Sequence, residues 1–161
     1  MSSVPWRQSG FTLFEVLIAV LILSIGLLGI AGLQTASLKS NHSAYQRSQA
    51  ALLAYDMIDR MRANQTGVAA GAYNDLDGSS SDPGCISSGC SAAAMAQYDD
   101  YQWGTAISQL LPAGKGKVSG AGTGSVFTVT VMWDDDQTGA TGEDCSGASG
   151  DLKCLSVSTQ L

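Results

Sequence analysis

The stretch that decides the fold is residues 10–33, which read GFTLFEVLIAVLILSIGLLGIAGL. From position 11 onward this run is apolar apart from Thr12, Glu15 and Ser24. A helix of this length rises ~1.5 Å per residue and can cross a hydrocarbon layer about 30 Å thick. The run therefore predicts a membrane-spanning helix near the start of the chain.

Glu15 is the only ionisable side chain inside this apolar run. A carboxylate at the centre of a membrane helix costs roughly 2.5–3.5 kcal/mol, so such a group normally has a partner. No basic residue follows until Lys39, about six helical turns away. A cut after Gly10 would supply a partner, because it would leave a positively charged amine on Phe11. That amine would lie one turn above Glu15, or opposite it on a neighbouring chain.

Gly10, followed by Phe-Thr-Leu-Phe-Glu and a long apolar helix, resembles the class III signal of type IV prepilins. Residues 24–34, SIGLLGIAGLQ, and residues 53–64, LAYDMIDRMRAN, look closer still to the minor pilins of this family. The resemblance implies cleavage after Gly10 by a prepilin peptidase and N-methylation of Phe11. It also implies that the helix packs among others in a filament, where Glu15 would serve assembly.

The same resemblance implies a non-enzymatic minor pilin of a type IV pilus, which primes assembly, lies at or near the tip, and serves twitching motility and adhesion. Its expected partners are other minor pilins, the major pilin, a tip adhesin, the prepilin peptidase and the inner-membrane assembly platform. It is expected to cross the inner membrane once before assembly, and to lie in the pilus filament or tip at the cell surface afterwards. A pseudopilin of type II secretion shares the leader and helix. A membrane-anchored periplasmic binding module that never polymerises is the other alternative.

Two simpler interpretations compete with a prepilin. A secretory signal peptide has a basic start and an apolar core of about 7–15 residues. Arg7 supplies the basic start, but the apolar run is too long and contains Glu15. A plain membrane anchor tolerates the length, yet it gives no reason for Glu15 or for Gly10 directly before Phe11. We therefore favour the prepilin.

Beyond the apolar run, apolar and aromatic side chains recur at helical spacings, which predicts a helix packed along one face. These residues are Leu38, Tyr45, Leu52, Tyr55, Ala54, Ile58 and Met61. No proline lies between Pro5 and Pro83, so one helix about 80 Å long can run from Phe11 to about Ala63. Such a helix is far longer than a bilayer is thick, so its second half must stand in the periplasm.

The chain thus divides into a leader at 1–10, a transmembrane segment at 11–33, a periplasmic amphipathic helix at 34–64 and a globular head at 65–161. From residue 65 onward three lysines stand against eleven acidic residues, a net charge of −8. An acidic head repels phosphate backbones, so no nucleic-acid partner is expected.

The head combines one short helix with several strands. Residues 98–111 predict a helix that Asp99 or Asp100 caps and Pro112 ends. Strands are expected at 126–133, at 155–159 and, more weakly, at 117–119, with Gly- and Ser-rich loops at 77–89, 113–124 and 139–150. Short links favour a small antiparallel sheet laid over the long helix. The predicted fold class is α+β, with the long N-terminal helix packed against this sheet as in type IV pilins.

All four cysteines lie in the head, which predicts disulfides formed in an oxidising periplasm. Three pairings are possible, and we expect the local one, Cys85–Cys90 with Cys145–Cys154, which closes two short loops. A zinc site is the rival. The spacing of Cys145 and Cys154 is too wide for the usual pair of ligands, and His42 lies far off on the helix.

The remaining polar residues predict no catalytic site, metal or cofactor. His42 is the only histidine, and Gly114–Lys117 lacks the upstream glycine of a phosphate loop. Asp134–Asp136 imitates the start of a calcium loop, but Cys145 stands where the twelfth position needs a glutamate. A solvated turn is therefore expected after the strand at 126–133.

Overall fold

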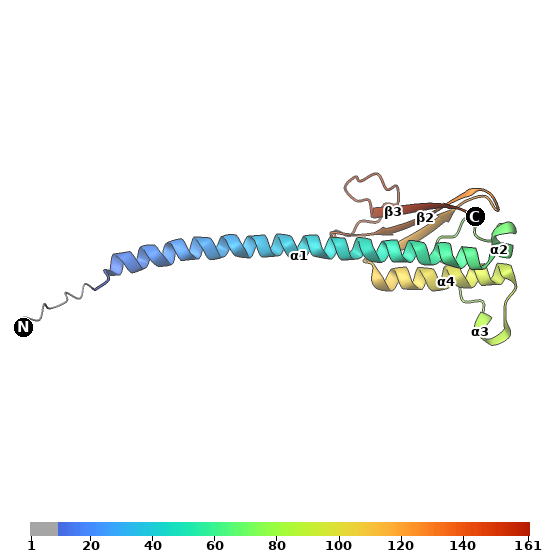
Figure 1. Cartoon of the computed structure of the whole chain (residues 1–161), viewed down its shortest axis with the longest axis horizontal. Coiled ribbons are helices and arrows are strands. Elements are labelled where there is room, and N and C mark those ends of the chain that lie inside the picture. Colours follow the sequence, from blue (N-terminus) through green and yellow to red (C-terminus); the bar gives the residue numbers. More distant parts are fainter. Residues whose placement is uncertain (1–9) are drawn as a thin grey trace, which may run out of the picture. The chain divides into compact units, whose positions relative to one another are not determined.

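The structure, a computed structural model, describes residues 10–161, so that residues 1–9 of the expected leader lie outside the described residues. Along the chain it contains α1 (Leu13–Ala63), α2 (Gln65–Ala69), α3 (Cys85–Ser88), α4 (Ala92–Leu110), β1 (Lys115–Ser119), β2 (Val126–Trp133) and β3 (Lys153–Gln160) (Figure 1). The three strands form one antiparallel sheet in the order β1-β2-β3. This confirms the expected α+β fold, a long N-terminal helix packed against a small sheet.

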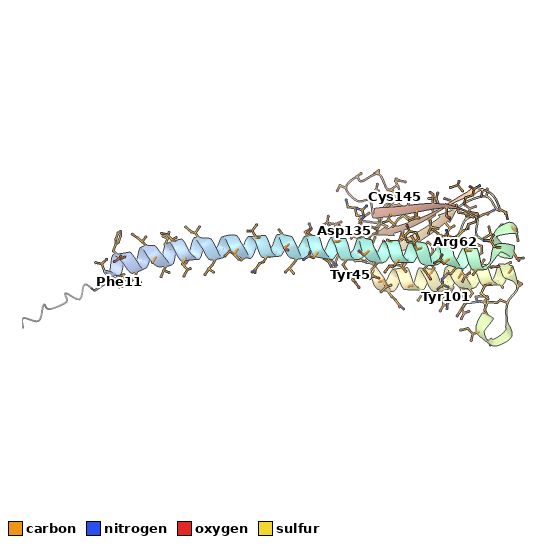
Figure 2. The ribbon with its side chains drawn as sticks, in the orientation of Figure 1. Phe11, Tyr45, Arg62, Tyr101, Asp135 and Cys145 are labelled. Atoms are coloured by element: carbon orange, nitrogen blue, oxygen red, sulfur yellow. A yellow bond between two sulfur atoms is a disulfide. The ribbon has the colours of Figure 1, made fainter. Side chains whose placement is uncertain are left out.

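The chain forms two compact units, one that ends at Asn41 and one from His42 to Leu161, and α1 runs through both. In the first unit every described residue is exposed, and side chains project from all sides of α1 (Figure 2). The helix is long and apolar enough to cross a membrane. The apolar surface that the sequence predicted is therefore uncovered within this chain.

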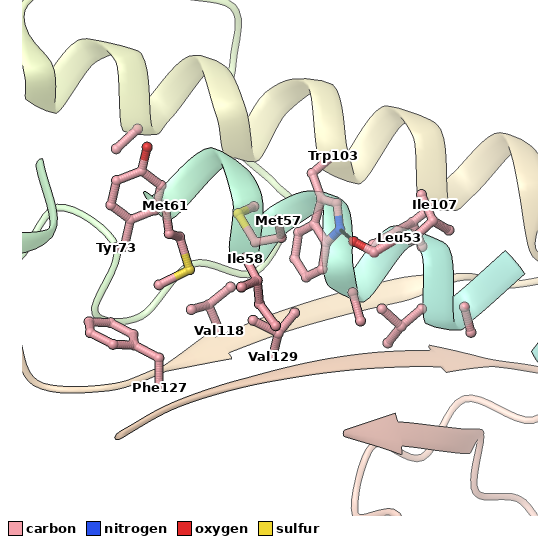
Figure 3. Close-up of a cluster of buried hydrophobic side chains, with 14 of the residues drawn as sticks. Leu53, Met57, Ile58, Met61, Tyr73, Trp103, Ile107, Val118, Phe127 and Val129 are labelled. Atoms are coloured by element: carbon pink, nitrogen blue, oxygen red, sulfur yellow. Dashed lines mark hydrogen bonds between the residues drawn. The ribbon is translucent and has the colours of Figure 1, made fainter. Parts of the chain in front are cut away.

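The second unit has its core where α1, α4 and the sheet meet (Figure 3). From α1 this core takes a face that contains two alanines, Ala50 and Ala54, both with no exposed surface. Trp103 of α4 fills the centre and donates its indole Nε1–H to the carbonyl oxygen of Leu53 at 2.9 Å. The other large buried residues are Met57, Ile58, Met61, Tyr73, Ile107, Val118, Phe127, Val129 and Val131.

The apolar face expected on α1 is wrong for four of its seven residues, which do not pack on the head. Leu38, Tyr45, Leu52 and Tyr55 are 55–68% exposed. The head instead packs on the face with Ala54, Ile58 and Met61, which the sequence also indicated. The small Ala50 and Ala54 of that face are fully buried, whereas Tyr45 and Tyr55 on the other side remain more than half exposed.

The expected strands at 117–119, 126–133 and 155–159 all lie within β1, β2 and β3. One face of the sheet carries the core side chains. The other face carries paired hydroxyls, Thr128 with Ser158 at 3.0 Å and Thr130 with Ser156 at 2.9 Å. This alternation of apolar and polar residues is the pattern from which the strands were predicted.

α4 begins six residues earlier than expected, and neither Asp99 nor Asp100 caps it. Ser91 is the cap, and its hydroxyl oxygen accepts a hydrogen bond from the Ala94 N–H at 3.2 Å. Both aspartates are buried in the middle of the helix. The loop expected at 77–89 also contains the one-turn helix α3.

Two disulfides join the same cysteines as the local pairing considered above. Cys85–Cys90 closes the loop that holds α3, with its Cα atoms 5.0 Å apart. Cys145–Cys154 ties the segment before β3 to the strand itself, with its Cα atoms 5.6 Å apart.

Candidate functional site

The start of α1 brings Gly10, Phe11 and Glu15 together at one exposed end. Gly10 and Phe11 precede the helix, and the Phe11 side chain is 84% exposed. Thr12 caps the helix: its Oγ1 and its carbonyl oxygen accept hydrogen bonds from the Glu15 N–H at 3.3 Å and 3.1 Å. Thr12 is therefore the cap residue and Glu15 the third residue of α1, the two positions that a capping box uses.

This local arrangement gives Glu15 a structural role that the sequence analysis missed. A carboxylate in the first turn lies near the positive end of the helix dipole, which stabilises the helix start. Among the ion pairs of residues 10–161, none involves Glu15. Its charge can therefore meet an amine near Phe11, on its own chain or on a neighbour.

Three glycines open the apolar helix to close contact. At Gly26, Gly29 and Gly32 an added Cβ would meet nothing within 4 Å in this chain. Small residues on a membrane helix let another helix approach its backbone. The structure thus leaves this face available for packing between chains.

A polar network joins the end of α1 to α4 in the head. Arg60 binds Asp56 at 2.8 Å, Asp99 at 3.2 Å and the Gln102 Oε1 at 2.8 Å, while Tyr73 donates its hydroxyl to Asp99 at 2.5 Å. Burial alone would lower the pKa of Arg60, but Asp56 and Asp99 raise it above its ordinary value. Burial, together with the bond to Asp99, raises the pKa of Tyr73. These groups satisfy one another's hydrogen-bonding capacity and hold α1 to α4.

The turn after β2 is more ordered than a solvated turn. Asp134 is buried, and its carboxylate accepts hydrogen bonds from Thr138 Oγ1 (3.3 Å), Gly139 N (2.7 Å) and Ala140 N (3.2 Å). Burial would raise the pKa of Asp134, but these bonds lower it below its ordinary value. The expectation of solvated carboxylates is thus wrong for Asp134, because the turn folds around it.

Asp135 is also engaged within the head. It accepts hydrogen bonds from Ser43 Oγ at 2.8 Å and from Trp133 Nε1 at 3.0 Å, which ties the turn to α1. In the described part of the chain no three His, Cys, Asp or Glu side chains are grouped so as to hold a metal ion. His42 lies against Gln46, with 2.9 Å between their Nε2 atoms.

Two known sequence families match this chain. Residues 32–101 match the family described as type IV pilin Tt1218, and residues 7–31 match the prokaryotic N-terminal methylation motif. Neither a curated protein nor a solved structure matches it. The two matched ranges adjoin each other and together cover more than half of the sequence.

The methylation motif and the apolar helix anchor the protein in a membrane before assembly and place it in a pilus at the cell surface afterwards. Pilins are structural proteins that assemble with other pilins through the pilus machinery. The matches and the fold lead to one conclusion, that this chain belongs to the type IV pilin family.

Proposed function

We propose that this pilin is a minor pilin, which primes filament assembly and remains at or near the tip of the pilus. The observation that carries this proposal is the likeness of residues 24–34 and 53–64 to the minor pilin PilV. Twitching motility and adhesion are the processes that it would serve. Other minor pilins, the major pilin and a tip adhesin would be its neighbours, and it would have no catalytic activity.

We infer that maturation removes the leader at 1–10 and methylates the new amine of Phe11. The exposed, non-helical backbone at Gly10 and Phe11 supports this, because a peptidase needs an accessible bond. Residues 11–33 would then span the inner membrane in a single pass. Residues 34–64 would stand in the periplasm and residues 65–161 would form the head.

In the filament, Glu15 would pair with the Phe11 amine of a neighbouring subunit. In lipid neither charge finds water, so pairing offsets a desolvation cost of several kcal/mol for each. Only one axial stagger of two helices brings the amine and the carboxylate together. The pair would therefore set the register of an incoming subunit.

The test combines mass analysis of the mature N-terminus with localisation of the subunit. Protein from sheared pili should begin at N-methylated Phe11, and labels on the head should gather at filament tips. A strain that lacks the gene should carry fewer pili. A mature chain that begins at Met1, or labels spread evenly along filaments, would contradict the proposal. Loss of secretion in place of pili would assign the protein to type II secretion.

A further inference from the structure

β1 is an edge strand, and its outer edge is only half covered. The N–H groups of Val118 and Gly120 point away from β2 and donate to the carbonyl oxygens of Leu76 (2.8 Å) and Asn74 (3.1 Å). The two contacts run in opposite directions along the two segments, as in an antiparallel pair. Residues 74–76 thus lie along β1 in the manner of a short fourth strand.

The same register would place Gly78 opposite Gly116, but the chain turns away before that point. The Gly78 N–H donates to Asp100 Oδ1 at 2.8 Å, and Asp100 Oδ2 accepts the Ser80 N–H at 3.1 Å. The Gly78 carbonyl oxygen lies against Gly104 of α4, where an added Cβ would come within 1.9 Å of it. Asp100 and Gly104 therefore hold this backbone on α4 and away from β1.

As a result, Gly116 keeps an unpaired edge. Alternation along the strand turns its N–H and C=O to the same side as those of Val118, away from β2. Gly116 is buried, and among residues 10–161 no acceptor or donor outside the ladder reaches its backbone. Buried backbone groups are paired in more than about 90% of cases. An unpaired edge at a buried position indicates a place for a further strand.

A groove of about 800 Å³ opens at this edge. β1 forms one side around Gly116, and the 75–80 segment and α4 form the others, with Tyr101 on α4 labelled in Figure 2. Its rim carries charges of both signs, among them Asp77 and Lys117, so charge does not select an occupant. The specific feature of the groove is the backbone edge of Gly116, which extended peptide matches best.

We propose that this groove binds a short extended segment of a neighbouring pilin subunit, which pairs with Gly116 as an added strand. Its C=O accepts from the Gly116 N–H, and its N–H donates to the Gly116 C=O. A filament holds neighbouring heads at high effective concentration, so another subunit is the first chain to meet an open edge. The inference rests on the proposed assembly into a pilus, and it concerns the head, not the membrane helix.

Two neighbouring positions on α4 provide a matched test. Ser108 lines the groove and Gln109 does not, and both are exposed. In the full chain, a photo-reactive benzoylphenylalanine at 108, but not at 109, should cross-link to a peptide of another pilin subunit in assembled pili. Ser108→Trp should lower incorporation into filaments about tenfold, because the loss of one buried interface contact typically weakens binding by about that factor. Gln109→Trp should leave incorporation unchanged.

Hydrogen exchange on the wild-type chain gives a readout that needs no variant. The Gly116 amide should exchange quickly in membrane-inserted subunits and slowly in filaments. Equal incorporation of the two tryptophan variants, or fast exchange of Gly116 in filaments, would overturn the inference. So would a cross-link from position 108 to a protein outside the pilus. If the wild-type protein is never found in pili, that result contradicts the proposed function itself, and it can be told apart from a failure of the inference about the groove.

Discussion

Two roles are proposed for Glu15, and they need different properties of its side chain. As the third residue of α1 it stands where a capping box with Thr12 as the cap has a glutamate or a glutamine. As the proposed partner of the Phe11 amine it would need a negative charge. Removing the side chain would abolish both roles, whereas changing it to an amide separates them.

We therefore expect Glu15→Gln to fail in assembly, as we also expect of Glu15→Ala. Both variants should insert in the membrane and be cleaved after Gly10, because neither adds charge to the helix. Their amount in sheared filaments should fall more than tenfold, because an unpaired amine in lipid costs several kcal/mol. Quantitative immunoblots of membranes and sheared pili measure this. Wild-type assembly of Glu15→Gln would mean that the cap alone explains Glu15.

At the scale of elements, periodicity in the sequence predicted most of the fold. The unbroken run before Pro83 predicted α1, and the alternation at 126–133 predicted β2. The start of α4 was missed because the run Ala92–Ala96 has no polar period, although it is rich in strong helix formers. Asp99 and Asp100 were misread as caps because aspartate favours helix starts.

The site could be predicted from the sequence only where its residues lie close together along the chain. The processing motif is local, and Thr12 followed by Glu15 three residues later was a readable capping box. In the network around Arg60, the partners Asp99 and Gln102 follow Arg60 by 39 and 42 positions in the sequence. No spacing pattern in the sequence predicts contacts over such separations. The open edge at Gly116 depends on where residues 78–80 leave the sheet, which only the folded chain shows.

The tie between α1 and α4 should be measurable as stability. Asp99 has only 9% of its side chain exposed and bridges Arg60 and Tyr73. Asp99→Asn should lower the free energy of unfolding by about 1–3 kcal/mol, because it leaves the Arg60 charge partly uncompensated. Urea unfolding of the full chain in detergent, followed by tryptophan fluorescence, measures this. Asp59→Asn is the control, since that side chain is 72% exposed, and it should change stability by less than about 0.5 kcal/mol.

At the scale of the whole molecule, acid should weaken the acidic head. Hydrogen bonds lower the pKa of Asp134, and those from Ser79 lower that of Asp77. Carboxylates with a lowered pKa stabilise the fold fully above their ordinary value of 3.8, and that contribution is lost as the pH falls below it. The urea midpoint should therefore drop between pH 7 and pH 3, and drop less in Asp134→Asn. An equal drop of the urea midpoint in Asp134→Asn would show that the turn around Asp134 does not contribute to the loss of stability in acid.

The way in which α1 is held in the second unit also has a mechanical consequence. From His42 to Ala63, within this unit, α1 is helical without interruption. The buried residues of α1 lie along its side between Gln46 and Met61. Within that length the Trp103 indole donates a hydrogen bond to the Leu53 carbonyl oxygen. An axial load acts on these contacts in shear, so several turns must slip together before any one contact is lost. The core of the second unit would therefore resist a pull along the axis of α1 through several turns at once.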